Sequence, residues 1–171
     1  MNQETSTIKS LGIVVFVAAV LISWVVANDC VSFASAEKVF VAELSGSNEV
    51  PPVNTHATGV AKFQLSADGQ TLNYRIDMTN INAVMGAHIH SGKHGQNGPV
   101  VAGLFNPNMR GPPTGIVHGL LAKGALKSGD LEGPLTGHPI IDLVHLIEGH
   151  GAYVNVHTQK HQEGEIRGQI S

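Results

Sequence analysis

The chain has 171 residues, of which 13% are charged, with a formal net charge of −3 and a single cysteine. This length gives room for one domain, and the nearly balanced charge does not favour nucleic acid as a partner. Residues 37–171 contain no cysteine, which excludes disulfides, thiolate metal ligands and a blue-copper site from that part of the chain.

The first 36 residues differ from the rest and predict a signal peptide or an N-terminal membrane anchor. Residues 11–27 form an uncharged apolar run, which predicts a hydrophobic helix. Ala34-Ser35-Ala36 is the small-x-small pattern that signal peptidases cleave, so we expect cleavage after Ala36. The alternative is an uncleaved anchor, because about 17 residues can span a thinned bilayer. In both cases residues 37–171 form the folded domain outside the cytoplasm, secreted or anchored to the outer face of the cytoplasmic membrane.

From residue 39 onward, short segments of alternating polarity are separated by Gly, Pro, Asn and Asp, as in all-β folds. The helical spacing of apolar residues after Pro139 predicts one short helix over 139–148. The expected fold class is therefore all-β, an antiparallel Greek-key-like β-sandwich or barrel with one short helix. Its expected strands span residues 39–44, 59–66, 72–78, 84–90, 99–104, 115–122, 152–158 and 165–170.

Three histidines carry most of the functional information. His88 and His90 are separated by Ile89, and alternate side chains of a strand leave by the same face, so the two imidazoles stand side by side. Two imidazoles on a rigid strand form half of a transition-metal site, and His157 on a distant strand would supply a third ligand. The alternative is a polar pair that simply faces solvent.

Side-chain alternation predicts which face of the sheet the histidine pair occupies. Met85, Ala87 and Ile89 form the apolar set of this strand and are expected to face the core. His88 and His90 therefore belong to the opposite, outer face.

The last two strands are expected to place further polar side chains on the same outer face. A loop of five residues, 159–163, would put His157 opposite Glu165 and Asn155 opposite Arg167. A change of one residue in that loop would break this register. If the loop has five residues, the outer-face group consists of His88, His90, His157 and Arg167.

Three neutral imidazoles with an open position suit copper or zinc. We expect copper because the domain is exported and lacks cysteine, with zinc as the alternative. His94 is a candidate fourth ligand, and Arg167 is expected to steer a small anion to the metal, unless it is structural. His56 and His118 are candidates of the same kind as His94. The surplus of histidines could also bind metal loosely as a buffer. The histidines expected simply at the surface are His138, His145, His150 and His161.

Six ordered motifs, taken together, resemble the CHRD domain, first described in chordin, over residues 38–171. This resemblance implies an extracytoplasmic β-sandwich-like domain, without a single biochemical activity for the family. The most regular polar residues of the family fall here at His88, His90, His157, Glu165 and Arg167. The motifs cover residues 49–52, 59–63, 87–90, 97–101, 153–158 and 164–169.

The segment 86–92, Gly-Ala-His-Ile-His-Ser-Gly, is also similar to the Gly-x-His-x-His copper motif of copper-zinc superoxide dismutases. Those enzymes are antiparallel β-sandwiches in which an arginine guides the anion, a role that the similarity would give to Arg167. The bridging histidine, the zinc-loop ligands and the disulfide cysteines of that family have no counterpart here. The similarity therefore extends only to a mononuclear copper site.

Three functional hypotheses follow. The enzyme hypothesis is dismutation of superoxide, a small anion, at copper held by His88, His90 and His157. The binding hypothesis is copper acquisition, storage or delivery with the same ligands and no catalysis. The third is an adhesive or protein-recognition domain, with an unknown protein partner, in which the histidines are incidental or bind structural zinc.

Overall fold

The computed structural model describes residues 38–110 and 115–171. The expected hydrophobic helix over 11–27 and the expected cleavage after Ala36 lie outside the described residues. Within the described ranges, no helix has the length and apolar character needed to cross a membrane.

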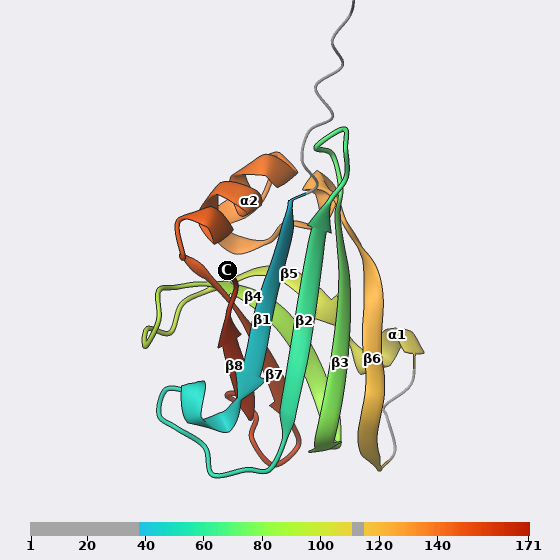
Figure 1. Cartoon of the computed structure of the whole chain (residues 1–171), viewed down its shortest axis with the longest axis vertical. Helices are drawn as coiled ribbons and strands as arrows, with labels where there is room; N and C mark the ends of the chain where they lie inside the picture. The colour runs from blue at the N-terminus through green and yellow to red at the C-terminus, as the bar shows by residue number, and fades with distance from the viewer. Residues whose placement is uncertain (1–37, 111–114) are drawn as a thin grey trace, which may run out of the picture. The chain divides into compact units, whose positions relative to one another are not determined.

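Eight antiparallel strands form one sheet (Figure 1). Their order is β5-β4-β7-β8-β1-β2-β3-β6, so the C-terminal strands β7 and β8 lie between β4 and β1. The antiparallel all-β prediction is confirmed, with all eight strands in a single sheet. The strands are β1 (Val39–Ser45), β2 (Thr58–Leu65), β3 (Leu72–Asn82), β4 (Val84–Ser91), β5 (Val100–Phe105), β6 (Ile116–Leu126), β7 (Ala152–Thr158) and β8 (Ile166–Gln169).

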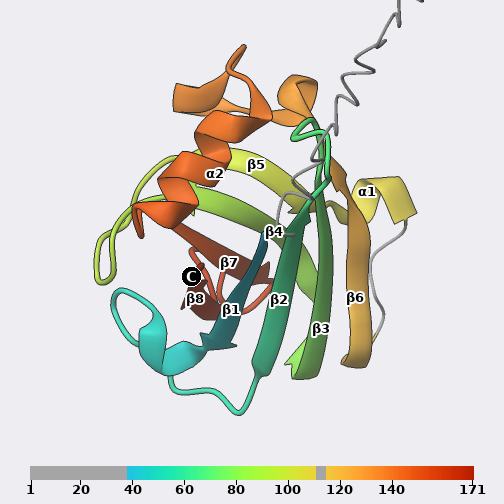
Figure 2. The same ribbon diagram turned by 45° about the horizontal axis from the view of Figure 1, so that its top comes forward.

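The sheet curls until its two ends approach each other, which makes it barrel-like (Figure 2). Tyr74 on β3, beside the edge strand β6, donates its hydroxyl hydrogen to the Leu104 carbonyl of the opposite edge strand β5 at 2.7 Å. Gly124 on β6 leaves space for the same ring, since a Cβ there would come within 2.7 Å of the Tyr74 hydroxyl. The edges are thus tied across the gap between them.

Helix α2 (Ile140–Glu148) begins after Pro139 and ends at Gly149, in agreement with the predicted helix over 139–148. Its buried residues are Ile140, Leu143, Val144 and Ile147, the positions that the helical spacing indicated. These side chains join the same apolar core as the inner face of the sheet. Four short elements were not predicted: η1 (Gly46–Asn48), α1 (Pro107–Arg110), η2 (Ser128–Asp130) and η3 (Gly133–Leu135).

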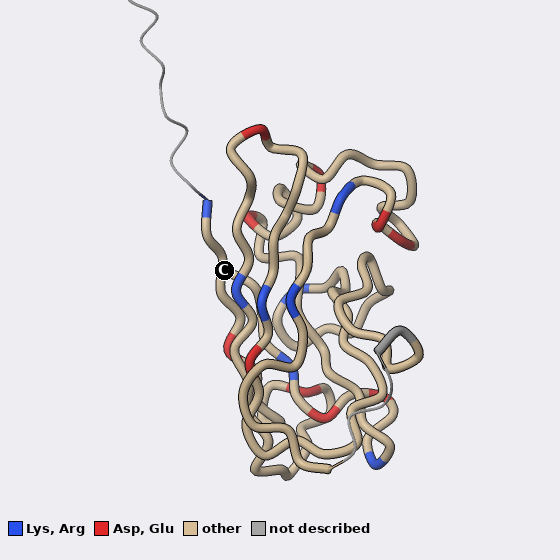
Figure 3. The backbone as a smooth tube through the Cα atoms, turned by 90° about the vertical axis from the view of Figure 1, so that its right-hand side faces the viewer, with Lys and Arg blue, Asp and Glu red and all other residues tan. Residues whose placement is uncertain are grey.

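The inner face of the strands supplies the apolar core, and polar groups gather on the outer face of β4, β7 and β8. Ala87 and Ile89 on β4 and Val154 and Val156 on β7 are fully buried, as alternation predicts. Figure 3 shows the acidic and basic positions interspersed along the described strands and loops. The outer face of β4, β7 and β8 is where the three histidines meet.

Candidate metal centre

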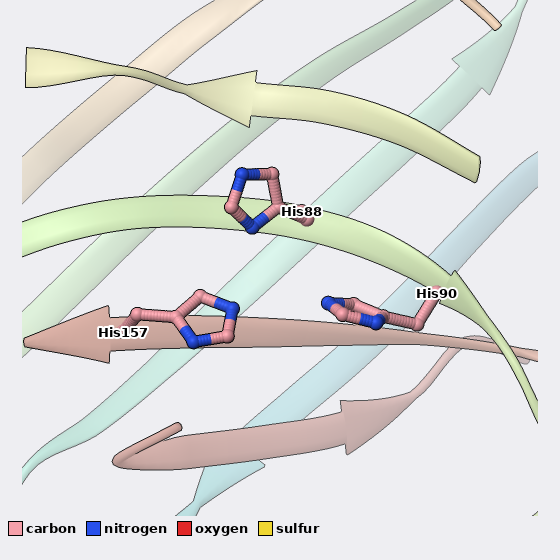
Figure 4. A group of neighbouring side chains, drawn as sticks. All are labelled: His88, His90 and His157. Carbon is pink, nitrogen blue, oxygen red and sulfur yellow. The ribbon is translucent and has the colours of Figure 1, made fainter. Parts of the chain in front are cut away.

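His88, His90 and His157 come together on two adjacent antiparallel strands. The register pairs Gly86 with His157 and His90 with Tyr153, so the three imidazoles share one face of β4 and β7. Figure 4 shows the rings turned toward one another. Ring centroids are 5.1 Å apart for His88 and His157, and 5.9 Å apart for each of the other two pairs. The predicted grouping of these three side chains is confirmed.

Backbone carbonyls set the orientation of two of the rings. Nδ1 of His90 lies 2.9 Å from the Gly98 carbonyl, and Nδ1 of His157 lies 2.9 Å from the Gln162 carbonyl. A carbonyl oxygen only accepts hydrogen bonds, so each Nδ1 carries a hydrogen, and in the neutral ring the lone pair is then on Nε2. This is the arrangement in which outer partners fix the tautomer of a metal-binding histidine.

One nitrogen of each ring points to a shared position. Nδ1 of His88, Nε2 of His90 and Nε2 of His157 are buried and have no hydrogen-bond partner among the described residues. One nitrogen from each ring lies within 4.8 Å of the other two, and Figure 4 shows the inward-facing nitrogen of each. Buried acceptors without partners are costly. A metal ion between them would satisfy all three.

The surroundings favour the uncharged form of the His88 and His90 imidazoles. Burial lowers the pKa of His88 to about 4, and the neighbouring His157 and His90 act in the same direction. Burial also lowers the pKa of His90, against the opposing effect of its Gly98 hydrogen bond. Neutral rings present lone pairs to a metal, so the site needs little or no proton release from these two ligands near neutral pH.

The three imidazoles line a cavity of about 490 Å³ at the surface of the domain. The other residues that line it are Met85, Gly86, Val100, Gln159 and Gln162. None of these described lining residues is charged. Gly86 leaves room for the His88 ring, because a Cβ there would lie 3.0 Å from Cε1 of His88.

Met85 departs from the sequence prediction, which placed it in the core with Ala87 and Ile89. Its side chain is 47% exposed and lines the histidine cavity. The cause is a register shift between Val84 and Gly86, since an extra residue in one strand turns the following side chains to the other face. The prediction for Met85 was wrong because regular alternation contains no signal for this bulge.

Arg167 lies opposite Asn155, as the loop length predicted, but its guanidinium is not in the cavity. The residue is 2% exposed. Nη1 donates to Oδ1 of Asn97 at 2.9 Å, and Nη2 donates to the Lys93 and Gln96 carbonyls at 3.1 and 2.7 Å. Arg167 therefore fastens the loop over 92–99, which is the structural alternative to anion steering.

Tyr153 stands between the histidine site and Arg167. Its ring stacks on His90 with centroids 5.1 Å apart and an angle of 15°, and Cζ of Arg167 lies 3.4 Å from the Tyr153 centroid. The Tyr153 hydroxyl accepts a hydrogen bond from the Gly98 amide at 3.1 Å. Gly98 therefore contacts both residues: its amide binds the Tyr153 hydroxyl, and its carbonyl binds Nδ1 of His90. The sequence did not indicate this role.

The remaining predicted residues lie apart from the three imidazoles. His94 is exposed in the loop over 92–99, and it is neither in the histidine group nor on the wall of the cavity. Glu165 is buried and accepts hydrogen bonds from the hydroxyls of Thr55 and Thr158, both at 2.7 Å. His138 pairs with Asp142 on the surface of α2. Glu165 thus supports the fold around the site without entering it.

A family model for the CHRD domain matches residues 40–170, which is most of the chain. No curated protein and no solved structure matches the chain. The family match agrees with the resemblance carried by the six sequence motifs. The chain belongs to the CHRD domain family.

Proposed function

We propose that this CHRD domain binds a single copper ion outside the cytoplasm and holds or delivers it. The ligands are Nδ1 of His88 and Nε2 of His90 and His157. The observation that carries the proposal is the convergence of three buried imidazole nitrogens that have no hydrogen-bond partner among the described residues. Their rings offer ligand atoms within 4.8 Å of one another. A polar pair that only faces solvent would not need two backbone carbonyls to fix its tautomers.

Copper is favoured over zinc by the charge of the donor set. An imidazole that binds a metal is a neutral donor, and the described residues around the cavity include no carboxylate and no cysteine. Among the divalent ions of the first transition series, affinity for nitrogen ligands is highest for copper, and imidazole suits both copper and zinc. A site without anionic ligands does least to offset the charge of a dication, which favours the cuprous ion. Zinc remains the alternative metal.

Binding is favoured over catalysis by the position of Arg167. Steering of superoxide requires a cation that faces the open coordination position, whereas the donors on Nη1 and Nη2 of Arg167 hold Asn97 and two carbonyls of the loop. The second candidate function is superoxide dismutation, and the open cavity of about 490 Å³ beside the ligands supports it, because a small anion has access. An adhesive role does not explain why three buried imidazole nitrogens that have no partner among the described residues face one another.

The test compares metal binding by the purified full-length chain with binding by two double variants. His88→Ala/His90→Ala removes two ligands, and His118→Ala/His145→Ala removes two exposed histidines elsewhere. We expect one copper per chain, a loss of affinity of about 100-fold or more in the first variant, equivalent to about 2.7 kcal/mol, and none in the second. Circular dichroism checks that both variants fold.

Three outcomes separate the hypotheses. Absence of copper and zinc binding at sub-micromolar concentration overturns the site itself. Tight zinc with weak copper corrects the metal and favours a structural role. Superoxide turnover by the copper-loaded wild type, lost with His88 and His90, would establish the enzyme instead of the binding protein.

A further inference from the structure

The β-bulge in β4 delivers one additional donor atom to the histidine cavity. Val84 pairs with Thr158 and Gly86 pairs with His157, so one step along β7 corresponds to two steps along β4. Met85 is the extra residue and has no partner on β7. Val84 and Thr158 remain buried on the inner face, while Met85 and Gly86 both line the cavity with the imidazoles.

Exposure alone would not make Met85 noteworthy, because single apolar side chains are common on protein surfaces. The position is unusual because two independent features coincide there. The strand departs from its regular register at this residue, and the departure brings the side chain to the wall of the one cavity where three buried nitrogens lack partners among the described residues. Bulges often occur next to functional sites, where they redirect a side chain.

The thioether of Met85 would influence which ion the site prefers. A thioether is a neutral, soft donor that selects the cuprous ion, and methionine has enough rotatable bonds to reach a ligand position from a cavity wall. Among the described residues that line the cavity, Met85 is the only one that contains sulfur.

We propose that Met85 supplies a thioether ligand that completes a four-coordinate site with His88, His90 and His157 and makes it selective for cuprous over zinc ions. This inference rests on the proposed copper-binding function and adds a fourth ligand, whose sulfur strengthens the preference for the cuprous ion. Four neutral donors leave the loaded site with the single positive charge of the ion. Met85 is 47% exposed and is the most exposed apolar side chain on the cavity wall.

The experiment measures the cuprous dissociation constant of the full chain by competition with a coloured cuprous chelator under anaerobic conditions. Met85→Leu keeps the size of the side chain and removes the sulfur. Gln159→Leu is the matched control, because Gln159 lines the same cavity and contains no sulfur. We expect cuprous affinity to fall by about tenfold or more in Met85→Leu and by less than about twofold in Gln159→Leu.

Two further readouts make the outcome specific. Zinc affinity should change by less than about twofold in Met85→Leu, because zinc gains little from a thioether. Copper K-edge absorption of the wild type should show one sulfur scatterer that is missing from the variant. Equal cuprous affinity of wild type and Met85→Leu, or a spectrum without sulfur, overturns the role of Met85 while the histidine site stands. Failure of the wild type to bind copper overturns both proposals.

Discussion

Two neighbouring regions on the outer face of the sheet differ in how their polar groups are hydrogen-bonded. One is the histidine cavity, and the other is the loop anchor, which consists of Arg167 and its acceptors in the loop over 92–99. In the cavity, one nitrogen each of His88, His90 and His157 is buried without a partner among the described residues. In the loop anchor, Arg167 is 2% exposed but donates three hydrogen bonds. Unsatisfied acceptors that converge indicate a binding site, whereas a satisfied cation indicates architecture.

The two regions are coupled through Tyr153 and Gly98. The Tyr153 ring contacts His90 on the side of β4 and Arg167 on the side of β8. Gly98 donates to the Tyr153 hydroxyl and accepts from His90. The loop that Arg167 fastens therefore also fixes the orientation of one proposed ligand. Variants in the loop anchor should act mainly on stability, and only secondarily on metal binding.

The largest effect that separates the two regions is expected from Arg167→Ala. Removal of the guanidinium leaves the Asn97 side chain and the Lys93 and Gln96 carbonyls without their donor, so we expect a loss of about 4 kcal/mol in the free energy of unfolding. Urea denaturation followed by circular dichroism measures this loss. Arg167→Lys should recover only part of it, because an ammonium group cannot reproduce the planar fork.

Anion steering predicts a different result for the same variant. In that case Arg167→Ala would unfold at the wild-type urea concentration, keep its copper, and show a slower and less salt-sensitive reaction with superoxide. Normal stability of Arg167→Ala would thus contradict the assignment of Arg167 to the loop anchor.

The comparison also shows how far alternation carries a sequence prediction. Regular strands with Ala87 and Ile89 inward forced His88 and His90 to the other face, and this part of the site was predicted correctly. The loop length of the last hairpin gave the pairing of Asn155 with Arg167. Both predictions depend only on the two-residue period of a strand and on counting.

The rest of the site depends on interactions that no local pattern encodes. Arg167 is on the predicted face but buried, because the loop over 92–99 folds across it and supplies the acceptors. Gly98 lets the two ends of this loop approach each other, since a Cβ there would collide with the Ser91 carbonyl. The prediction placed Met85 in the core because it continued the alternation of Ala87 and Ile89 back along β4. The bulge between Val84 and Gly86 breaks that alternation at Met85.

A second effect concerns Glu49, a buried carboxyl near the loop anchor. Glu49 is 5% exposed, and its Oε1 has no partner among the described residues. Burial raises the pKa of Glu49 to about 7 from 4.5, against the opposing charge of Arg167. Between these two values the folded state keeps a proton that the unfolded state releases, so stability should fall as pH rises from about 4.5 to about 7.

Glu49→Gln tests this effect because the amide cannot ionise. Titration of Glu49 should lower the free energy of unfolding of the wild type by about 3 kcal/mol over that pH range. This contribution should be absent from Glu49→Gln. Urea denaturation at a series of pH values measures the difference. Glu43→Gln, at an exposed position, is the control and should follow the wild type. Parallel curves for wild type and Glu49→Gln would show that folding does not raise the pKa of Glu49.

The smallest effect is expected where the two regions meet, in Tyr153→Phe. This variant keeps the ring between His90 and Arg167 and removes only the acceptor of the Gly98 amide. We expect a loss of about 1 kcal/mol in the free energy of unfolding, because one hydrogen bond is lost. Copper affinity should fall by less than about threefold, since His90 keeps its hydrogen bond to the Gly98 carbonyl.

Tyr153→Leu, which also removes the stacked ring, should lower both stability and copper affinity further. If Tyr153→Phe alone weakens copper binding as much as Tyr153→Leu does, the hydroxyl and not the ring orients His90. The loop anchor would then affect the position of His90 through the Gly98 peptide, which contacts both His90 and the Tyr153 hydroxyl, and not through the Tyr153 ring.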